Sequence, residues 1–316
     1  MTRYLVRRLL SLVFVLWGMS VVIFLAMRLL PGDVINMLMG METAPTAETR
    51  AILEHQYGLD RPLVVQYWLW IGRVVQGDLG VSMRSQQPVV HDLLRKLPVT
   101  VELTFLSVSL ATIIAVPLGV VSAVRPNSVT DFVSRIVGVF GLSIPNFWLA
   151  TLLIMFCSRI LGWLPPPIFV TFTENPIVNL QQMLMPTISL SLLMVANTMR
   201  MTRGTVIEEM TRDYVRVARS KGLSETVVIG RHVLKNVAIP VVTRVGMSIG
   251  YLLGGAIIIE QIFALPGLGW FLWNGVSQRD YTSAQAAVMV GCLFFAIVNL
   301  VVDLLYALLD PRIRRA

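Results

Sequence analysis

Residues 216–225 read RVARSKGLSE, a charged and polar stretch that lies between two long apolar runs, 184–199 and 239–263. The chain as a whole has the opposite character, because its mean hydropathy is +0.73 and only 14% of its residues are charged. Soluble domains average about 25% charged residues. This composition predicts a polytopic membrane protein, in which a polar segment of this kind needs an explanation.

Six apolar runs are long enough to cross a bilayer as helices, which takes about 20 residues each. They cover residues 9–27, 103–124, 136–158, 184–199, 239–263 and 282–302. The first run is longer than the apolar part of a secretory signal and has no small-residue cleavage site after it, so we expect an uncleaved span. The sequence therefore predicts an all-α polytopic membrane protein with six transmembrane helices.

The distribution of positive charge predicts the orientation. Most of the 26 Lys and Arg residues lie at the two termini and in the segments after the second and fourth runs, whereas the short loops on the other side hold only Arg159 and Arg279. By the positive-inside rule, both termini are cytoplasmic. We attribute the net charge of +8 to this topology, not to nucleic-acid binding.

The predicted organisation has three parts. Residues 1–30 form the first transmembrane helix, 31–98 form an external segment, and 99–316 form a core of five transmembrane helices. The external segment has periodic apolar patches at 52–57 and 63–75, which predict short amphipathic helices near the membrane surface.

The cytoplasmic segment between the fourth and fifth runs has the pattern of two helices joined at a glycine. Gly222 takes the left-handed conformation after a helix without steric penalty, and Lys221 suits the negative end of that helix. Ser224 is a natural N-cap for a second helix, which we expect to run to about Asn236, with Pro240 opening the fifth span. The first helix has an apolar stripe at helical spacing, formed by Ile207, Met210, Tyr214 and Ala218.

We interpret this segment, residues 203–236, as a rigid projection that fits a groove on a partner. An ordinary solvated loop is the alternative, but its basic residues would satisfy topology without two capped helices. The predicted contact residues are Tyr214, Arg216, Ala218, Arg219, Lys221, Gly222, Leu223 and Ser224.

The stretch DYVRVARSKGLSETVVIGRHVLKNVAIP, residues 213–240, resembles the ATPase-contacting "EAA" loop of ABC importer permeases, and within them the dipeptide/oligopeptide/nickel branch. Other segments are similar to the same branch across nearly the whole chain. They are LPGD at 30–33, YGLDRPLVVQYWLWIGRVVQGDLGVSM at 57–83, FALPGLGWFLWNGVSQRDY at 263–281 and DPRIR at 310–314.

The chain departs from the general pattern at three positions. Arg216 stands where the general loop has Glu, so that contact is not carried over, and Val217 replaces the first Ala. Val34 follows LPGD where the branch often has Pro. Ala218 and Gly222 match the pattern.

The resemblance implies which partners supply the energy. No G-x-x-x-x-G-K-[ST] motif occurs, so the chain has no loop of this type to cradle ATP phosphates. The family implies two ATPase subunits that bind ATP and Mg²⁺, a second homologous permease, an external substrate-binding protein and the surrounding bilayer. This chain would hold no cofactor itself and would be a non-catalytic transport subunit.

The fifth run carries Gly246, Gly250 and Gly254 four residues apart, on one helical face. Small residues at this spacing let membrane helices approach closely, either within the chain or at a pore seam with the second permease. The same segment, GMSIG, matches the G-x-S-x-G nucleophile motif. That motif requires a strand-to-helix turn, so we interpret these glycines as packing residues.

Polar residues within the runs are candidates for a transport pathway. The segment SIPN at 143–146 interrupts the third run, and such breaks are tolerated where they face protein or water. We consider Pro145, Asn146 and Asn197 as pathway residues. Asn299, Asp303 and Glu260 are further polar candidates, but Glu260 and Asp303 lie near the ends of their runs, where structural pairing is at least as compatible. Arg244 lies near the other end of the fifth run.

The cargo stays open at this stage. Peptides are the first candidate, and a nickel chelate or glutathione fits the same architecture. His55, His91 and the group Met37, Met39 and Met41 are possible metal contacts, although such methionines are more often packing residues, as we expect for Cys157 and Cys292. An ion-coupled secondary transporter would need a mid-span charge relay and an inverted repeat, neither of which is found.

Overall fold

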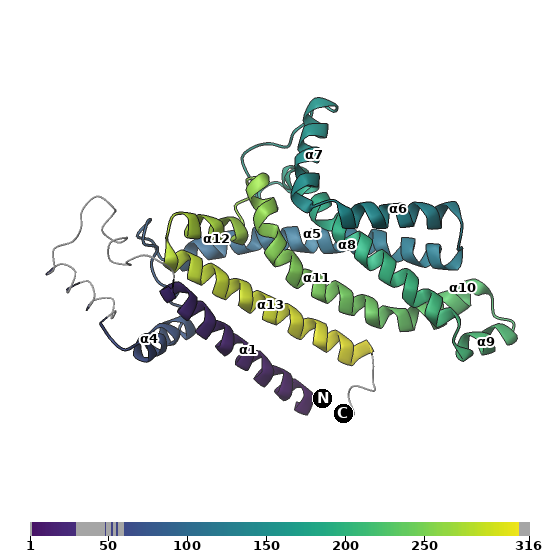
Figure 1. The fold of residues 1–316 in the computed structure, drawn as a ribbon, viewed down its shortest axis with the longest axis horizontal. Coiled ribbons are helices and arrows are strands. Elements are labelled where there is room, and N and C mark those ends of the chain that lie inside the picture. The colour runs from purple at the N-terminus through teal and green to yellow at the C-terminus, as the bar shows by residue number, and fades with distance from the viewer. Residues whose placement is uncertain (1, 30–47, 49–51, 53–54, 56–59, 310–316) are drawn as a thin grey trace. The chain divides into compact units, whose positions relative to one another are not determined.

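The computed structural model describes residues 2–29, 48, 52, 55 and 60–309. Within these residues the secondary structure is helical, apart from one isolated bridge between Val81 and Pro88. The elements, shown in Figure 1, are α1 (Thr2–Leu29), α4 (Leu63–Val75), α5 (Val89–Val124), α6 (Val129–Ser143), α7 (Asn146–Arg159), α8 (Pro176–Met210), α9 (Asp213–Ser220), α10 (Glu225–Val227), the π-helical η1 (Val228–Val233), α11 (Leu234–Ile262), α12 (Leu268–Ser277) and α13 (Tyr281–Leu309).

The predicted all-α membrane architecture is confirmed, with one change in the third span. In the described part of the chain, five helices are long and apolar enough to cross a membrane, and a sixth crossing exists if α6 and α7 together count as one. These two helices are bent by 106° at their junction. The membrane orientation stays a prediction.

The bend follows from the sequence SIPN. Pro145 cannot donate a backbone hydrogen bond, and it disfavours the helical conformation at the residue before it. Ile144 is accordingly extended, with φ −92° and ψ 120°. The Pro145 carbonyl then accepts hydrogen bonds from the backbone N–H groups of Trp148 and Leu149, both at 3.0 Å, and these start α7. The predicted interruption of the third run is therefore confirmed.

The chain divides into two compact units. One comprises the described part of Thr2–Val99 together with Pro266–Ala296. In it, Tyr67 of α4 is buried, and its hydroxyl lies 2.8 Å from the Ser20 hydroxyl of α1. Helix α4 has the bounds expected for the second amphipathic patch, whereas most of the first patch lies outside the described residues, as do LPGD, Met37, Met39, Met41 and DPRIR.

Helix α12 was not predicted, because its sequence was assigned to a loop before the last span. It packs against the first turns of α5 and against α13 through a shared apolar core, made by Val89, Leu93, Leu268, Phe271, Ala286 and Ala287. Asp280, which precedes α13, accepts hydrogen bonds from the Ser82 hydroxyl at 2.5 Å and the Ser283 hydroxyl at 2.7 Å. These bonds attach the start of α13 to Ser82, in the segment before α5.

The second unit comprises Thr100–Leu265 and the part of α13 from Ile297 onward. Helix α8 packs against α6, α7 and α11, and α9 and α10 lie beyond its C-terminal end (Figure 1). A second apolar core, the valine core, joins this end of α8 to α9, η1, α11 and the last turns of α5. Its members are Ala123, Val206, Val215, Ala218, Val228, Val233, Val237 and Val241.

A buried carboxylate ties three helices together next to the valine core. Asp131 of α6 is fully buried and accepts hydrogen bonds from Arg135, from the Ser122 hydroxyl of α5 and, at 2.9 Å, from Arg203 Nε of α8. The backbone N–H of Asn127 donates to the same carboxylate at 3.0 Å. Buried charges persist where they are paired and hydrogen-bonded. The sequence analysis did not single out Asp131, although Arg203 opens the predicted cytoplasmic projection.

We expect Asp131→Asn to lower the thermal unfolding temperature of the purified chain in detergent by several degrees, because it leaves the Arg203 guanidinium without its carboxylate. Arg203→Gln removes the other partner, so the double variant should lose less than the sum of the two single losses. Additive losses in this double-mutant cycle would contradict a direct Asp131–Arg203 interaction.

Gly246 of α11 makes a close contact within the chain. A Cβ atom built on Gly246 would lie 2.5 Å from a methyl carbon of Val302 in α13, which is shorter than any ordinary contact. Gly246 therefore packs closely within the chain, and its place at a pore seam with a second permease stays a prediction. Gly250 lies on the same helix, and the surroundings of Gly254 are outside the description.

We expect Gly246→Ala to destabilise the chain by about 1–3 kcal/mol, since overpacking outweighs the gain in helix propensity. Gly204→Ala is the matched control, because no atom lies within 4 Å of the position of its added Cβ. That variant should be neutral or slightly stabilising. Thermal unfolding in detergent measures both, and equal effects would contradict the contact.

Candidate functional site

The predicted glycine corner is present at the end of α9. Gly222 has φ +75°, in the left-handed region that favours glycine, so its prediction as the residue after the helix is confirmed. Its N–H donates to the Arg219 carbonyl at 2.9 Å, and the Leu223 N–H donates to the Ala218 carbonyl at 3.4 Å. This pair of bonds is the Schellman pattern, which satisfies carbonyls that the helix end leaves free.

A salt bridge braces the corner from outside. Glu225 in the first turn of α10 accepts hydrogen bonds from Arg219 Nε at 2.7 Å and Arg219 Nη2 at 3.2 Å. This bonding holds the pKa of Arg219 above its usual value. Ser224 occupies the predicted N-cap position with φ −62° and ψ 148°, but its carbonyl, not its hydroxyl, takes up the free N–H groups, those of Val227 and Val228.

The helices on either side of the corner differ from the prediction. The expected stripe through Ile207, Met210, Tyr214 and Ala218 does not lie on one helix, because α8 ends at Met210 and α9 begins at Asp213. Ile207 is 38% exposed, and Val206 and Val215 are buried instead. Arg212 is extended between the two helices, with φ −66° and ψ 149°. This turn rotates α9 relative to α8, which a 3.6-residue period cannot reveal.

The second helix does not stop near Asn236. From Glu225 the chain is helical through η1 and α11 to Ile262, and Pro240 lies inside α11 instead of opening it. The corner is therefore continuous with the fifth span, so displacement of one acts directly on the other.

Helix α9 is attached to both neighbouring long helices through Glu209 at the end of α8. The Tyr214 hydroxyl donates to Glu209 Oε2 at 2.5 Å, and Asn236 Nδ2 of α11 donates to the same oxygen at 3.3 Å. Burial, followed by the bond to Glu209, raises the pKa of Tyr214. We call α9, the corner at Gly222 and α10 together the elbow. Tyr214 and Ala218, both predicted as contact residues, thus face the inside of the elbow.

The outer surface of the elbow includes three further predicted residues and one residue that was not predicted. Val217 is 52% exposed and Leu223 is 39% exposed, and Arg216 and Lys221 are also exposed. We call these four residues the elbow face. Val217, noted in the sequence as a departure from the family pattern, lies between the predicted contact residues Arg216 and Ala218. The elbow face combines apolar and positively charged side chains.

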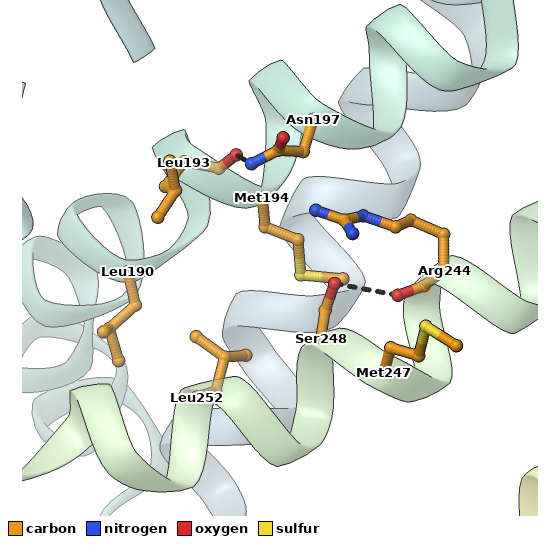
Figure 2. Close-up of a pocket in the computed structure, with 8 residues that line it drawn as sticks. All are labelled: Leu190, Leu193, Met194, Asn197, Arg244, Met247, Ser248 and Leu252. Carbon is orange, nitrogen blue, oxygen red and sulfur yellow. Dashed lines mark hydrogen bonds between the residues drawn. The ribbon is translucent and has the colours of Figure 1, made fainter. Parts of the chain in front are cut away.

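A cavity of about 420 Å³ lies between α8 and α11 (Figure 2). It is lined by Leu190, Leu193, Met194, Asn197, Arg244, Met247, Ser248 and Leu252. Among the predicted pathway residues, Asn197 contributes to it. Pro145 and Asn146 lie at the bend between α6 and α7 and do not line it.

Arg244, which was expected near the end of its span, lies within the continuous helical segment Glu225–Ile262. Figure 2 shows its side chain extending from α11 toward Met194 and Asn197 of α8. Asn197 Nδ2 donates to the Leu193 carbonyl at 3.0 Å, and the Ser248 hydroxyl donates to the Arg244 carbonyl at 2.8 Å. Within the described residues, no hydrogen bond or ion pair engages the Arg244 guanidinium.

The structure also describes three other features that the sequence analysis considered. The G-x-S-x-G match lies inside α11 and has no strand-to-helix turn. Glu260 is fully buried and accepts a hydrogen bond from the Thr100 hydroxyl at 2.6 Å. His55 pairs with Asp60 at 3.0 Å on the surface, and the described residues contain no group of three His, Cys, Asp or Glu side chains that could hold a metal ion.

Comparison with known proteins agrees with this architecture over the whole chain. Residues 115–315 match the family model described as "Binding-protein-dependent transport system inner membrane component", and residues 1–104 match the model of the N-terminal part of such membrane components. Among solved structures, the inward-facing MetNI methionine ABC transporter has a chain of similar fold. Its TM-score is 0.55 at 19% identity, over 69% of this chain and 96% of that one.

Two characterised relatives are similar over their full length. A glutathione transport system permease protein of Escherichia coli is 40% identical over 314 residues, which is 99% of each chain. A dipeptide transport system permease protein of Alkalihalophilus pseudofirmus is 38% identical over 334 residues, which is 99% of this chain and 100% of that one. Together with the helical architecture, these matches show that the chain belongs to the inner-membrane components of binding-protein-dependent transport systems, the permeases of ABC importers.

Proposed function

We propose that this chain is the permease subunit of an ATP-driven, binding-protein-dependent importer of dipeptides and oligopeptides. The single observation that carries the coupling role is the braced elbow, which presents exposed Val217 and Leu223 beside Arg216 and Lys221. Exposed apolar side chains that lie together and are rimmed by polar residues are typical of protein–protein contacts. The lack of a phosphate-binding loop in the sequence supports a separate ATPase as that partner.

The complete transporter in this proposal contains two ATPase subunits, a second permease homologous to this chain and an external substrate-binding protein. The ATPase subunits bind ATP and Mg²⁺, so this chain needs no cofactor and is not catalytic. Residues 31–98 belong to the external side, where the binding protein docks, and 203–236 belong to the cytoplasmic side. Each half of the translocation pathway comes from one permease.

Force is transmitted through the interior of the elbow. Closure of the ATPase pair displaces the elbow face, and α9 cannot move alone because the valine core and Glu209 fix it to α8 and α11. These two helices also line the cavity that contains Asn197 and Arg244. A movement at the elbow therefore changes the geometry of the cavity, which is what alternating access requires.

The choice of peptides rests on the two relatives, named for dipeptide and glutathione transport. Glutathione is itself a modified peptide, so it is the second candidate cargo. The external binding protein sets most of the selectivity, and its ligand distinguishes the two.

The assembled transporter in proteoliposomes should take up dipeptide only when ATP and the binding protein are both present. We expect Gly222→Pro to reduce this uptake at least about tenfold, because proline requires φ near −65° and cannot donate to Arg219. Gly222→Asn should keep most of the activity, since asparagine tolerates the left-handed region. Full activity of Gly222→Pro in both uptake and ATP hydrolysis would contradict the role of the elbow. Uptake driven by a proton gradient without ATP would instead indicate a secondary transporter.

Charge placed on the elbow face should weaken the ATPase contact. We expect Val217→Asp or Leu223→Asp to reduce the ATPase that co-purifies with the chain by about tenfold, as at a buried contact position in an interface. Ile168→Asp is the matched control, because Ile168 is an equally apolar, 80% exposed residue in the loop between α7 and α8. If the control loses as much ATPase as the elbow variants, the elbow face is not the contact.

A further inference from the structure

The cavity between α8 and α11 has the size and lining of a small-ligand site. Its volume of about 420 Å³ falls in the range of about 300–1,000 Å³ that is typical of such sites. Five of the lining side chains are aliphatic or thioether groups: Leu190, Leu193, Leu252, Met194 and Met247. The other three lining residues, Arg244, Asn197 and Ser248, carry polar side chains. One wall is thus apolar, and one end is cationic.

Among the lining residues, Arg244 is the one whose charged side chain is least favourable inside a membrane-spanning helix. A guanidinium inside a membrane-spanning helix is energetically unfavourable, and such residues face cavities and mark pathways. Among the residues that the structure describes, no carboxylate bonds to the Arg244 guanidinium. The five N–H donors of this guanidinium suit the planar, two-oxygen geometry of a carboxylate.

We propose that Arg244 is a transient binding group for the carboxylate of the cargo, within the pathway between α8 and α11. The ligand class is a small peptide with a free carboxylate, whose side chains lie against the leucine and methionine wall. Asn197 places a polar amide near the same end, and its side chain is held by the Leu193 carbonyl. This inference rests on the proposed peptide-import function and adds which chemical group of the peptide is recognised inside the membrane.

The positive charge of Arg244 distinguishes cationic cargo from anionic cargo. The Arg244 guanidinium repels a free metal ion, so the cavity disfavours unchelated nickel and favours anionic groups. A carboxylate that binds here comes from a peptide, from a small free anion, or from the facing permease subunit. Lining by apolar side chains favours a peptide over a small free anion, because only the peptide has apolar surface to bury.

The test measures binding to the purified permease–ATPase complex in detergent, without the external binding protein. A ligand that binds the folded state raises its unfolding temperature. Dialanine at millimolar concentration should stabilise the wild-type complex, whereas dialanine amide, which lacks the carboxylate, and acetate, which lacks the apolar part, should not. In Arg244→Gln we expect the affinity for dialanine to fall at least about tenfold, as for loss of a charged hydrogen-bonded pair.

Arg159→Gln is the matched control, because it removes the same charge at the exposed end of α7, outside the cavity. It should bind dialanine as the wild type does. The proposal is overturned if dialanine fails to stabilise the wild type, if the amide or acetate stabilises it equally, or if Arg244→Gln retains the full effect. Loss of the second permease from Arg244→Gln, seen by size-exclusion chromatography, would assign the guanidinium to the subunit interface instead. ATP-dependent uptake by the wild type tests the import function separately.

Discussion

The hydrocarbon interior of the membrane is the constraint on which this structure depends. Backbone polar groups in that interior must bond to one another, so the chain crosses as helices and departs from helical geometry only where other groups satisfy the backbone. At the α6–α7 bend, the carbonyl of Pro145 bonds to the first turn of α7. At the elbow, the Schellman bonds around Gly222 do the same outside the bilayer.

The elbow and the cavity are linked because they share two helices. The valine core and the hydrogen bonds to Glu209 attach α9 to both α8 and α11, and Asp131 attaches α8 to α5 and α6 through Arg203. An ionic network around Asp131 therefore connects α5, α6 and α8 close to the start of the predicted projection at Arg203. Because these contacts attach α9 to α8 and α11, a displacement of α9 also displaces those two long helices.

The residues predicted as contacts divide into two groups with different roles. Ala218 and Tyr214 face inward and set the shape of the elbow, while Arg216, Lys221 and Leu223 face outward. Periodicity alone could not separate them, because the break at Thr211 and Arg212 resets the helical phase between α8 and α9.

The sequence by itself determined the helical membrane architecture, the interruption at SIPN, the bounds of α4 and the glycine corner, because each depends on local composition, proline or the conformational freedom of glycine. Only the tertiary structure revealed the Asp131–Arg203 pair, the Gly246–Val302 contact and the position of Arg244 in a cavity with Asn197. These features join residues that are far apart in the chain. Their formation depends on how helices pack, and helix periodicity does not encode which faces meet.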